Sequence, residues 1–338
     1  MFWWLLTGLA LLSWGFTGAL RQYAHTRWLD MPNERSSHVE PTPHGGGLAV
    51  VVTFFVGLLV LLFAELVSVQ MVAGFAGAGA LVAVVGFWDD HAPLPARWRL
   101  LAHIIAAAWG VYWLGGLPEL SVLGYPLALG VAGDLLLVIV LVWLLNLYNF
   151  MDGIDGIAGV EALTVGVAGA WLALVATPDA TVHLPLVLAA SVLGFLIWNY
   201  PPAKIFMGDV GSGFIGLILG LLMVTASQQH EPLFWAWLIL LGSFIVDATV
   251  TLITRVFHGE TFYEAHRSHA YQYLSRKLGQ HKPVTLLYGA LNLLWLFPIA
   301  LLVALERLDG LPAVTLAYAP LVMLAIYFKA GNARKQEV

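Results

Sequence analysis

The sequence predicts an all-α integral membrane protein of about eleven transmembrane helices, with its N-terminus outside and its C-terminus in the cytoplasm. Of its 338 residues, 60% are hydrophobic and only 10% are charged, whereas globular domains carry about 25% charged residues. Apolar stretches long enough to cross about 30 Å of hydrocarbon recur from end to end, and the positive charges gather between alternate stretches. We therefore expect one polytopic membrane domain, residues 1–338, without a soluble domain.

The apolar stretches that we expect to span the membrane follow one another with short connections. They are residues 1–20, 46–68, 71–88, 99–117, 128–148, 158–177, 183–198, 211–228, 232–256, 284–304 and 311–328. The first stretch lacks the basic start and the A-x-A-like cleavage site of a signal peptide, so we expect it to be retained as a helix.

The distribution of lysine and arginine predicts the orientation of the chain. With flanking residues included, 14 of the 15 lie in the C-terminal tail or in five connecting segments, and only Arg307 lies on the other side. Because positive residues accumulate in cytoplasmic loops, we expect these five segments to face the cytoplasm and to carry the catalytic loops. The segments are residues 21–45, 89–98, 149–157, 199–210 and 257–283.

Composition also excludes some classes of function. The chain contains no cysteine, so disulfides and thiolate metal sites cannot contribute. Its net charge of −5 and isoelectric point near 6.1 offer no electrostatic basis for binding nucleic acid.

Two adjacent acids, Asp89 and Asp90, follow the third apolar stretch directly. Neighbouring carboxylates repel each other, and a helix C-terminus is the unfavourable end of the dipole for anions. Something should therefore compensate the pair, although a solvated acidic helix end is the alternative interpretation.

The stretch NFMDGIDG places Asn149, Asp152 and Asp155 at intervals of three residues. In a helix these side chains would fall within about 120° of one another, beside a stripe of glycines. A capping turn would explain one acid, but it does not explain two acids and an amide in register.

The stretch FMGDVGSG places Asp209 at the start of a helix among glycines. Such a start offers free N–H groups and a positive dipole end to phosphate, and it stabilises Asp209 as an anion that can hold a hard cation. The pattern is not the G-x-x-x-x-G-K-[ST] phosphate loop.

The last inner loop contains His266 and His269 on either side of Arg267. Zinc would need a third ligand, which is not evident. Binding of phosphate fits these residues better, and an ordinary hydrophilic loop is the alternative.

Together, the four clusters provide carboxylates and an amide that suit Mg²⁺ and basic groups that suit phosphate oxygens. A phosphorylated lipid, a soluble pyrophosphate, or both would be the substrates.

In this order, DDH, NFMDGIDG, FMGDVGS and HRSH resemble the motifs of the polyprenyl-phosphate N-acetylhexosamine-1-phosphate transferases, glycosyltransferase family 4. DMPNERSSHVEPTPHGGGLA is similar to the family's segment after its first helix, and HRSHAYQ resembles the O-antigen-initiating branch. The resemblance implies transfer of sugar-1-phosphate from a UDP-N-acetylhexosamine to undecaprenyl phosphate, with release of UMP. It implies a bacterial inner membrane protein whose active site faces the cytoplasm.

The resemblance also implies roles for individual residues. Asp89 and Asp90 match the acid pair next to the lipid phosphate, Asp209 matches the metal ligand, and Asn149 matches the amide near the same ion. Asp152 and Asp155 fall in the nucleotide and active-site loop, His266, Arg267 and His269 in the donor loop, and Arg99 at a basic position near phosphate. Ser37 and His38 are candidates for the lipid phosphate or for ordering the first loop, and Lys204 for phosphate or for snorkelling.

We expect Mg²⁺ as the cofactor, with Mn²⁺ as a substitute, and a 6-deoxy donor such as UDP-N-acetylfucosamine or UDP-N-acetylquinovosamine. UDP-N-acetylglucosamine is the alternative donor, and a homodimer is an open alternative to a monomer.

Direct attack of the lipid phosphate is favoured over a covalent aspartyl-phosphate through Asp89 or Asp90. The rival class is an ion-coupled transporter, because Asp247 lies within an apolar stretch. An aspartyl protease is disfavoured, because its G-x-G-D pattern would need glycine in place of Phe206.

Overall fold

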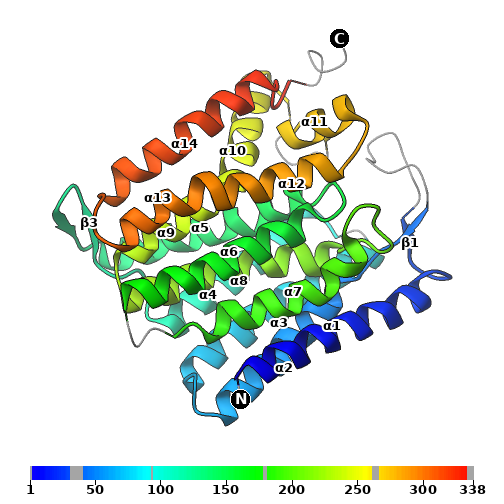
Figure 1. The fold of residues 1–338 in the computed structure, drawn as a ribbon, viewed down its shortest axis with the longest axis horizontal. Coiled ribbons are helices and arrows are strands. Elements are labelled where there is room, and N and C mark those ends of the chain that lie inside the picture. Colours follow the sequence, from blue (N-terminus) through cyan, green and yellow to red (C-terminus); the bar gives the residue numbers. More distant parts are fainter. Residues whose placement is uncertain (1, 31–40, 93, 178–180, 261–265, 333–338) are drawn as a thin grey trace.

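The computed structural model describes residues 2–30, 41–92, 94–177, 181–260 and 266–332. The described chain is a helical bundle with two short hairpins (Figure 1), and every one of the predicted apolar stretches overlaps a helix. The first third of the chain forms the helices α1 (Phe2–Ala24), α2 (Gly47–Phe63), α3 (Val69–His91) and α4 (Ala96–Leu114). The middle of the chain forms α5 (Gly130–Met151), α6 (Ile157–Ala176), α7 (His183–Asn199) and α8 (Asp209–Gln229).

In the last third of the chain, most helices are shorter than in the first two thirds. Its elements are α9 (Pro232–Leu240), α10 (Gly242–Phe257), α11 (Ala270–Leu278), α12 (Lys282–Leu291), the π-helical turn η1 (Asn292–Leu296), α13 (Phe297–Ala304) and α14 (Gly310–Tyr327). The single span expected over residues 232–256 is two helices, α9 and α10, bent by 67°. The bend falls where Gly242 packs against the ring of Tyr318 and has no room for a side chain, and such glycines are a common cause of kinks.

Seven helices of the described chain are long and apolar enough to cross a membrane, if α12, η1 and α13 are counted as one continuous helix, Lys282–Ala304. The number is eight if α9 and α10 count as one bent span. Two further apolar helices, α2 and α7, have 17 residues each. The protein is therefore an all-α, multi-pass membrane protein. The number of eleven crossings and the orientation of the termini stay predictions.

Helix α8 lies in the middle of the bundle and packs against α2 to α7 and α9 (Figure 1). Its apolar window is buried along its whole length. Glycines allow this close packing: a side chain at Gly216 would lie 2.7 Å from Cβ of Tyr148, and one at Gly211 would lie 2.6 Å from Cα of Gly47. Small residues let membrane helices approach closely in this way.

Two short antiparallel hairpins complete the fold, and the sequence had indicated only loops at both places. Strands β1 (Leu29–Asp30) and β2 (Thr42–Pro43) pair near the start of α2, and β3 (Leu120–Val122) pairs with β4 (Tyr125–Leu127) between α4 and α5. The chain after β2 hydrogen-bonds to the segment before α8, through Gly46 N to Phe206 O at 2.9 Å and Phe206 N to Pro43 O at 2.8 Å. The hairpin therefore lies against the start of α8.

Candidate active site

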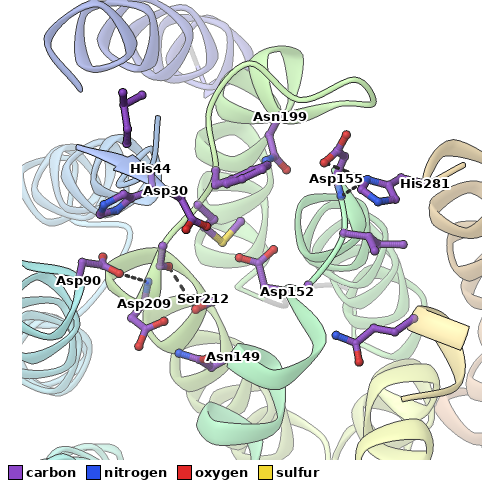
Figure 2. A pocket seen from close by; sticks show the side chains of 17 residues that line it. Asp30, His44, Asp90, Asn149, Asp152, Asp155, Asn199, Asp209, Ser212 and His281 are labelled. Carbon is purple, nitrogen blue, oxygen red and sulfur yellow. Dashed lines mark hydrogen bonds and ion pairs between the residues drawn. The ribbon is translucent and has the colours of Figure 1, made fainter. Parts of the chain in front are cut away.

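A pocket of about 480 Å³ opens where the start of α8 meets the loops after α5 and α7 (Figure 2). This volume is typical of small-molecule sites. Its polar lining residues are Asp30, His44, Asp90, Asn149, Asp152, Asp155, Asn199, Asp209, Ser212, Gln272 and His281. Five are aspartates, and none of the described residues that line it is lysine or arginine. In Figure 2, His44 and Asp90 lie on one side, Asp155 and His281 on the other, and Asp209, Asn149 and Asp152 between them.

Asp90 lies at the end of α3, but its carboxylate binds the start of α8. Its two oxygens accept hydrogen bonds from the backbone N–H groups of Asp209, at 2.8 Å, and Val210, at 3.2 Å. The first N–H groups of a helix have no partner within the helix and form its positive end. The positive N-terminus of α8 therefore stabilises the negative charge of Asp90, which lies at the unfavourable C-terminal end of α3.

Gly208 allows this contact. It has φ +77° and ψ 168°, a region that is almost restricted to glycine. A Cβ atom here would lie 2.7 Å from Asp90 Oδ2. The glycine of the FMGD motif is thus required both by the backbone conformation and by the approach of Asp90.

Asp89 has different partners from its neighbour and does not line the pocket. Its side chain, 8% exposed, accepts a hydrogen bond from Leu94 N at 2.6 Å and forms an ion pair with Arg99. The Arg99 guanidinium also lies 3.7 Å from the Asp209 carboxylate. Asp89 thus closes the turn between α3 and α4 and holds Arg99 beside Asp209.

The loop after α5 does not keep the helical register that the spacing had predicted. Helix α5 ends at Met151, and residues 152–156 form a loop in which Gly156 has φ +74°. The helix ends here because the glycines interrupt it. Asn149, Asp152 and Asp155 nevertheless all line the pocket. Burial and the charge of Asp90 raise the pKa of the Asp209 carboxyl group, whereas the amide of Asn149 favours its ionised form.

Asp152 lies in an electrostatically unfavourable place. Burial raises its pKa well above the usual range, and the carboxylates of Asp209 and Asp90 raise it further. Burial and like charges both disfavour the ionised form of a carboxyl group. A cation in the pocket would relieve this repulsion.

Asp155 joins three segments at the other side of the pocket. One oxygen accepts a hydrogen bond from Ala203 N at 3.0 Å, and the other lies 3.1 Å from Nδ1 of His281, just before α12. The Thr285 hydroxyl donates to the Asp155 carbonyl at 2.7 Å. Beside it, Asn199 accepts a hydrogen bond from Gly156 N at 3.0 Å. The loop 152–156 is thereby fixed against the loop after α7 and the start of α12.

Several predicted site residues lie outside the pocket lining. Lys204 lies over the Trp198 ring at 5.6 Å, and Arg267 is exposed. His269 is 2% exposed and stacks on His266, with ring centroids 4.8 Å apart. Ser37 and His38 lie outside the described residues. The substrate roles of these residues, like those of the residues that do line the pocket, stay predictions.

Among the polar residues of the pocket lining, Asp30, His44, Gln272 and His281 were not singled out from the sequence. His44 comes shortly before the second apolar stretch and His281 shortly before the tenth. A titratable residue at the inner end of a span was therefore the signal available for both. Asp30 reaches the pocket through the β1–β2 pairing, which the sequence pattern did not indicate.

Comparisons of the sequence with known proteins identify relatives of this chain. The profile of glycosyl transferase family 4 matches residues 72–227. A probable undecaprenyl-phosphate N-acetylglucosaminyl 1-phosphate transferase of Bacillus subtilis is 31% identical over 263 residues, which cover 73% of this chain and 69% of that protein. A decaprenyl-phosphate N-acetylglucosaminephosphotransferase of Mycolicibacterium smegmatis is 31% identical over 255 residues, covering 63% and 59%. A phospho-N-acetylmuramoyl-pentapeptide-transferase of Streptococcus pyogenes is 27% identical over 226 residues, covering 62% and 65%.

The profile match contains the acid pair, the loop after α5 and the start of α8, which are three of the four motifs noted above. The alignments cover between 59% and 69% of the lengths of these relatives. The chain therefore belongs to glycosyl transferase family 4, the polyprenyl-phosphate N-acetylhexosamine-1-phosphate transferases.

Proposed function

We propose that the protein transfers an N-acetylhexosamine 1-phosphate from a UDP-sugar to undecaprenyl phosphate and releases UMP, at the cytoplasmic face of a bacterial inner membrane. The observation that carries this proposal is the aspartate-lined pocket around the start of α8, which gathers residues of three sequence motifs in one place. The names of the Bacillus and Mycolicibacterium relatives, an undecaprenyl-phosphate and a decaprenyl-phosphate transferase, support it.

Mg²⁺ is the proposed cofactor, with Mn²⁺ as a substitute. Among the described residues, no group of three or more His, Cys, Asp or Glu side chains could hold a metal alone. Mg²⁺, however, usually takes one or two protein carboxylates and completes its shell with water and substrate phosphates. Asp209 and Asn149, which line the same pocket, fit this requirement. When bound there, the cation would neutralise charge on the phosphoryl oxygens.

The transfer itself requires alignment more than covalent chemistry. An oxygen of the lipid phosphate attacks the β-phosphorus of the donor and forms a new P–O bond. The bond from that phosphorus to the bridging oxygen breaks, and UMP leaves with that oxygen. The start of α8 contributes a positive dipole end at the pocket, and Arg99 contributes a fixed charge beside Asp209.

The hydrogen bonds of the acid pair support direct attack over a covalent aspartyl-phosphate. Both oxygens of Asp90 accept hydrogen bonds from backbone N–H groups. Asp89 accepts a hydrogen bond from Leu94 N and forms an ion pair with Arg99. A carboxylate nucleophile would have to give up such bonds. We expect inversion at phosphorus when the donor carries a chiral β-phosphorus, whereas retention would support the two-step route.

For the donor, we propose a 6-deoxy sugar such as N-acetylfucosamine or N-acetylquinovosamine, used to start O-antigen or another surface polysaccharide. The motif HRSHAYQ supports this choice. UDP-N-acetylglucosamine is the alternative, supported by the names of the Bacillus and Mycolicibacterium relatives.

The test is an assay of UMP release by the protein purified in detergent, with undecaprenyl phosphate and a panel of UDP-N-acetylhexosamines, with Mg²⁺ or with EDTA. We expect metal-dependent UMP release that is lost in Asp209→Asn, and the donor with the highest kcat/KM identifies the sugar. Equal turnover of UDP-N-acetylglucosamine would remove the 6-deoxy preference. No UMP from any donor, with the protein folded, would contradict the proposed activity.

A further inference from the structure

Asp247 on α10 is a buried acid with no part in the chemistry proposed above. It is 3% exposed and lies outside the lining of the active-site pocket. Ionisable residues within membrane spans are costly, and those that remain are usually paired or functional. Its partners therefore indicate what it does.

The Asp247 carboxylate holds the start of α11. It accepts hydrogen bonds from the backbone N–H groups of Ala270, at 2.9 Å, and Tyr271, at 3.0 Å. The Tyr288 hydroxyl donates to it at 2.6 Å, and Nδ1 of His269 lies 3.6 Å away. An acid from another helix thus binds the N–H groups that α11 leaves without an internal partner.

Helix α11 in turn holds the end of α5, from which the acidic loop of the active site begins. The Tyr271 hydroxyl donates to the carbonyl of Phe150 at 2.9 Å, two residues before Asp152. Gln272 lines the pocket, and its side-chain oxygen accepts a hydrogen bond from His269 N at 3.3 Å.

Gly153 shows how closely α11 and this loop fit together. A Cβ atom at this position would collide with the Tyr271 hydroxyl and lie 3.0 Å from Nε2 of Gln272. Burial raises the pKa of Tyr271 well above its usual range, and the charge of Asp247 raises it further. The phenol therefore keeps the proton that it donates to Phe150.

We propose that Asp247 is a positioning residue of the active site, which fixes α11 so that Tyr271 and Gln272 hold the loop 152–156, and with it Asp152, opposite Asp209. His269 of the HRSH motif then acts through its packing at the start of α11, because it lies against Asp247 and away from the pocket lining. The kinetic part of this inference rests on the proposed function.

The test compares Tyr271→Phe, which removes one hydroxyl and leaves Asp247 in place, with Asp247→Asn. The matched control is Tyr318→Phe, because the Tyr318 hydroxyl also donates to a backbone carbonyl, that of Leu238 at 2.6 Å, on residues outside the pocket lining. The readouts are hydrogen–deuterium exchange of the peptide over residues 149–156, and kcat and KM for each substrate.

We expect faster exchange in residues 149–156 and a loss of kcat of roughly tenfold or more in Tyr271→Phe and Asp247→Asn, because a small displacement of reacting groups can cost about 100-fold. The KM for undecaprenyl phosphate should not change, and the double variant should lose no more than the more severe single variant. Tyr318→Phe should show neither effect.

Wild-type exchange and wild-type kcat in Tyr271→Phe would overturn the inference, even if Asp247→Asn fails to fold. A wild-type protein that releases no UMP would contradict the proposed function alone, because the exchange measurement tests the positioning role without turnover.

Discussion

At the scale of single residues, the carboxylate of Asp90 shows why neighbouring acids need not do the same work. Asp90 binds the first N–H groups of α8, whereas Asp89 binds the turn before α4 and Arg99. The sequence indicated that an acid pair at a helix C-terminus needs compensation. It could not indicate that the compensation comes from another helix more than a hundred residues later in the chain, because that contact depends on how the helices pack.

Gly208→Ala should separate the acid from the helix that it caps. The substitution places an L side chain in a glycine-only backbone region and 2.7 Å from Asp90 Oδ2. We expect a loss of about 1–3 kcal/mol of unfolding free energy and loss of most UMP release. Thermal unfolding in detergent and the UMP assay measure both effects.

Gly124→Ala is the control for backbone strain alone, because Gly124 has φ +79° with nothing within 4 Å of an added Cβ. It should lose stability without losing kcat. If Gly208→Ala retained wild-type kcat, the contact between Asp90 and α8 would not matter for catalysis.

His281→Ala should weaken binding of the donor. His281 lines the pocket beside Asp155, and its side chain is 17% exposed. Because it and His44 are the basic groups among the described lining residues, we expect the KM for the UDP-sugar to rise roughly tenfold, the scale of one lost hydrogen bond to a charged group. The KM for undecaprenyl phosphate should stay unchanged.

The matched control for this measurement is His258→Ala, an exposed histidine outside the pocket lining, which should have wild-type constants. An unchanged donor KM in His281→Ala would place the donor elsewhere in the pocket.

At the scale of elements, the glycines of α8 let this helix pack closely against α5. The distance between the two helices sets the distance between Asp209 and Asn149. Gly216→Ala would place a methyl group 2.7 Å from Cβ of Tyr148 and 2.9 Å from the Leu144 carbonyl. Overpacking of this kind costs about 1–3 kcal/mol. We expect a lower thermal midpoint and a weaker response of that midpoint to Mg²⁺.

Gly8→Ala in α1 is the matched helical control, because an added Cβ meets nothing within 4 Å. It should be neutral or stabilising by up to about 1 kcal/mol, since alanine is the better helix former. Equal losses in the two variants would show that the effect is not one of packing against α5.

The helices themselves were predictable, because the length of an apolar stretch is what spans hydrocarbon. The predicted stretch 211–228 and helix α8, for example, differ by only one or two residues at each end. The bend at Leu241, the loop register at Asp152 and the pairing of Asp30 with Thr42 were not predictable. Each depends on a neighbour that is distant in sequence, such as the Tyr318 ring against Gly242.

At the scale of the whole molecule, the active-site loops lie together at one end of the bundle, and the β3–β4 hairpin belongs to the other (Figure 1). The charge distribution predicts that the active-site end faces the cytoplasm. A direct test is available because the chain has no cysteine.

Single cysteines at Tyr125, in β4, and at His258, after α10, should report the orientation in intact cells. Both positions are exposed. We expect a membrane-impermeant maleimide to label Tyr125→Cys and to label His258→Cys only after the cells are permeabilised. The reverse pattern would contradict the predicted orientation.

The bond between Asp90 and the first turn of α8 also has a thermodynamic consequence. It joins the helix that carries the acid pair to the helix that carries Asp209, so a displacement of one is transmitted to the other. The two substrates would then not bind independently. By the reciprocity of linkage, the factor by which bound lipid changes the affinity for the nucleotide sugar must equal the factor by which the bound sugar changes the affinity for the lipid. The order in which the substrates arrive would then alter the rates of the individual steps but not the stability of the ternary complex.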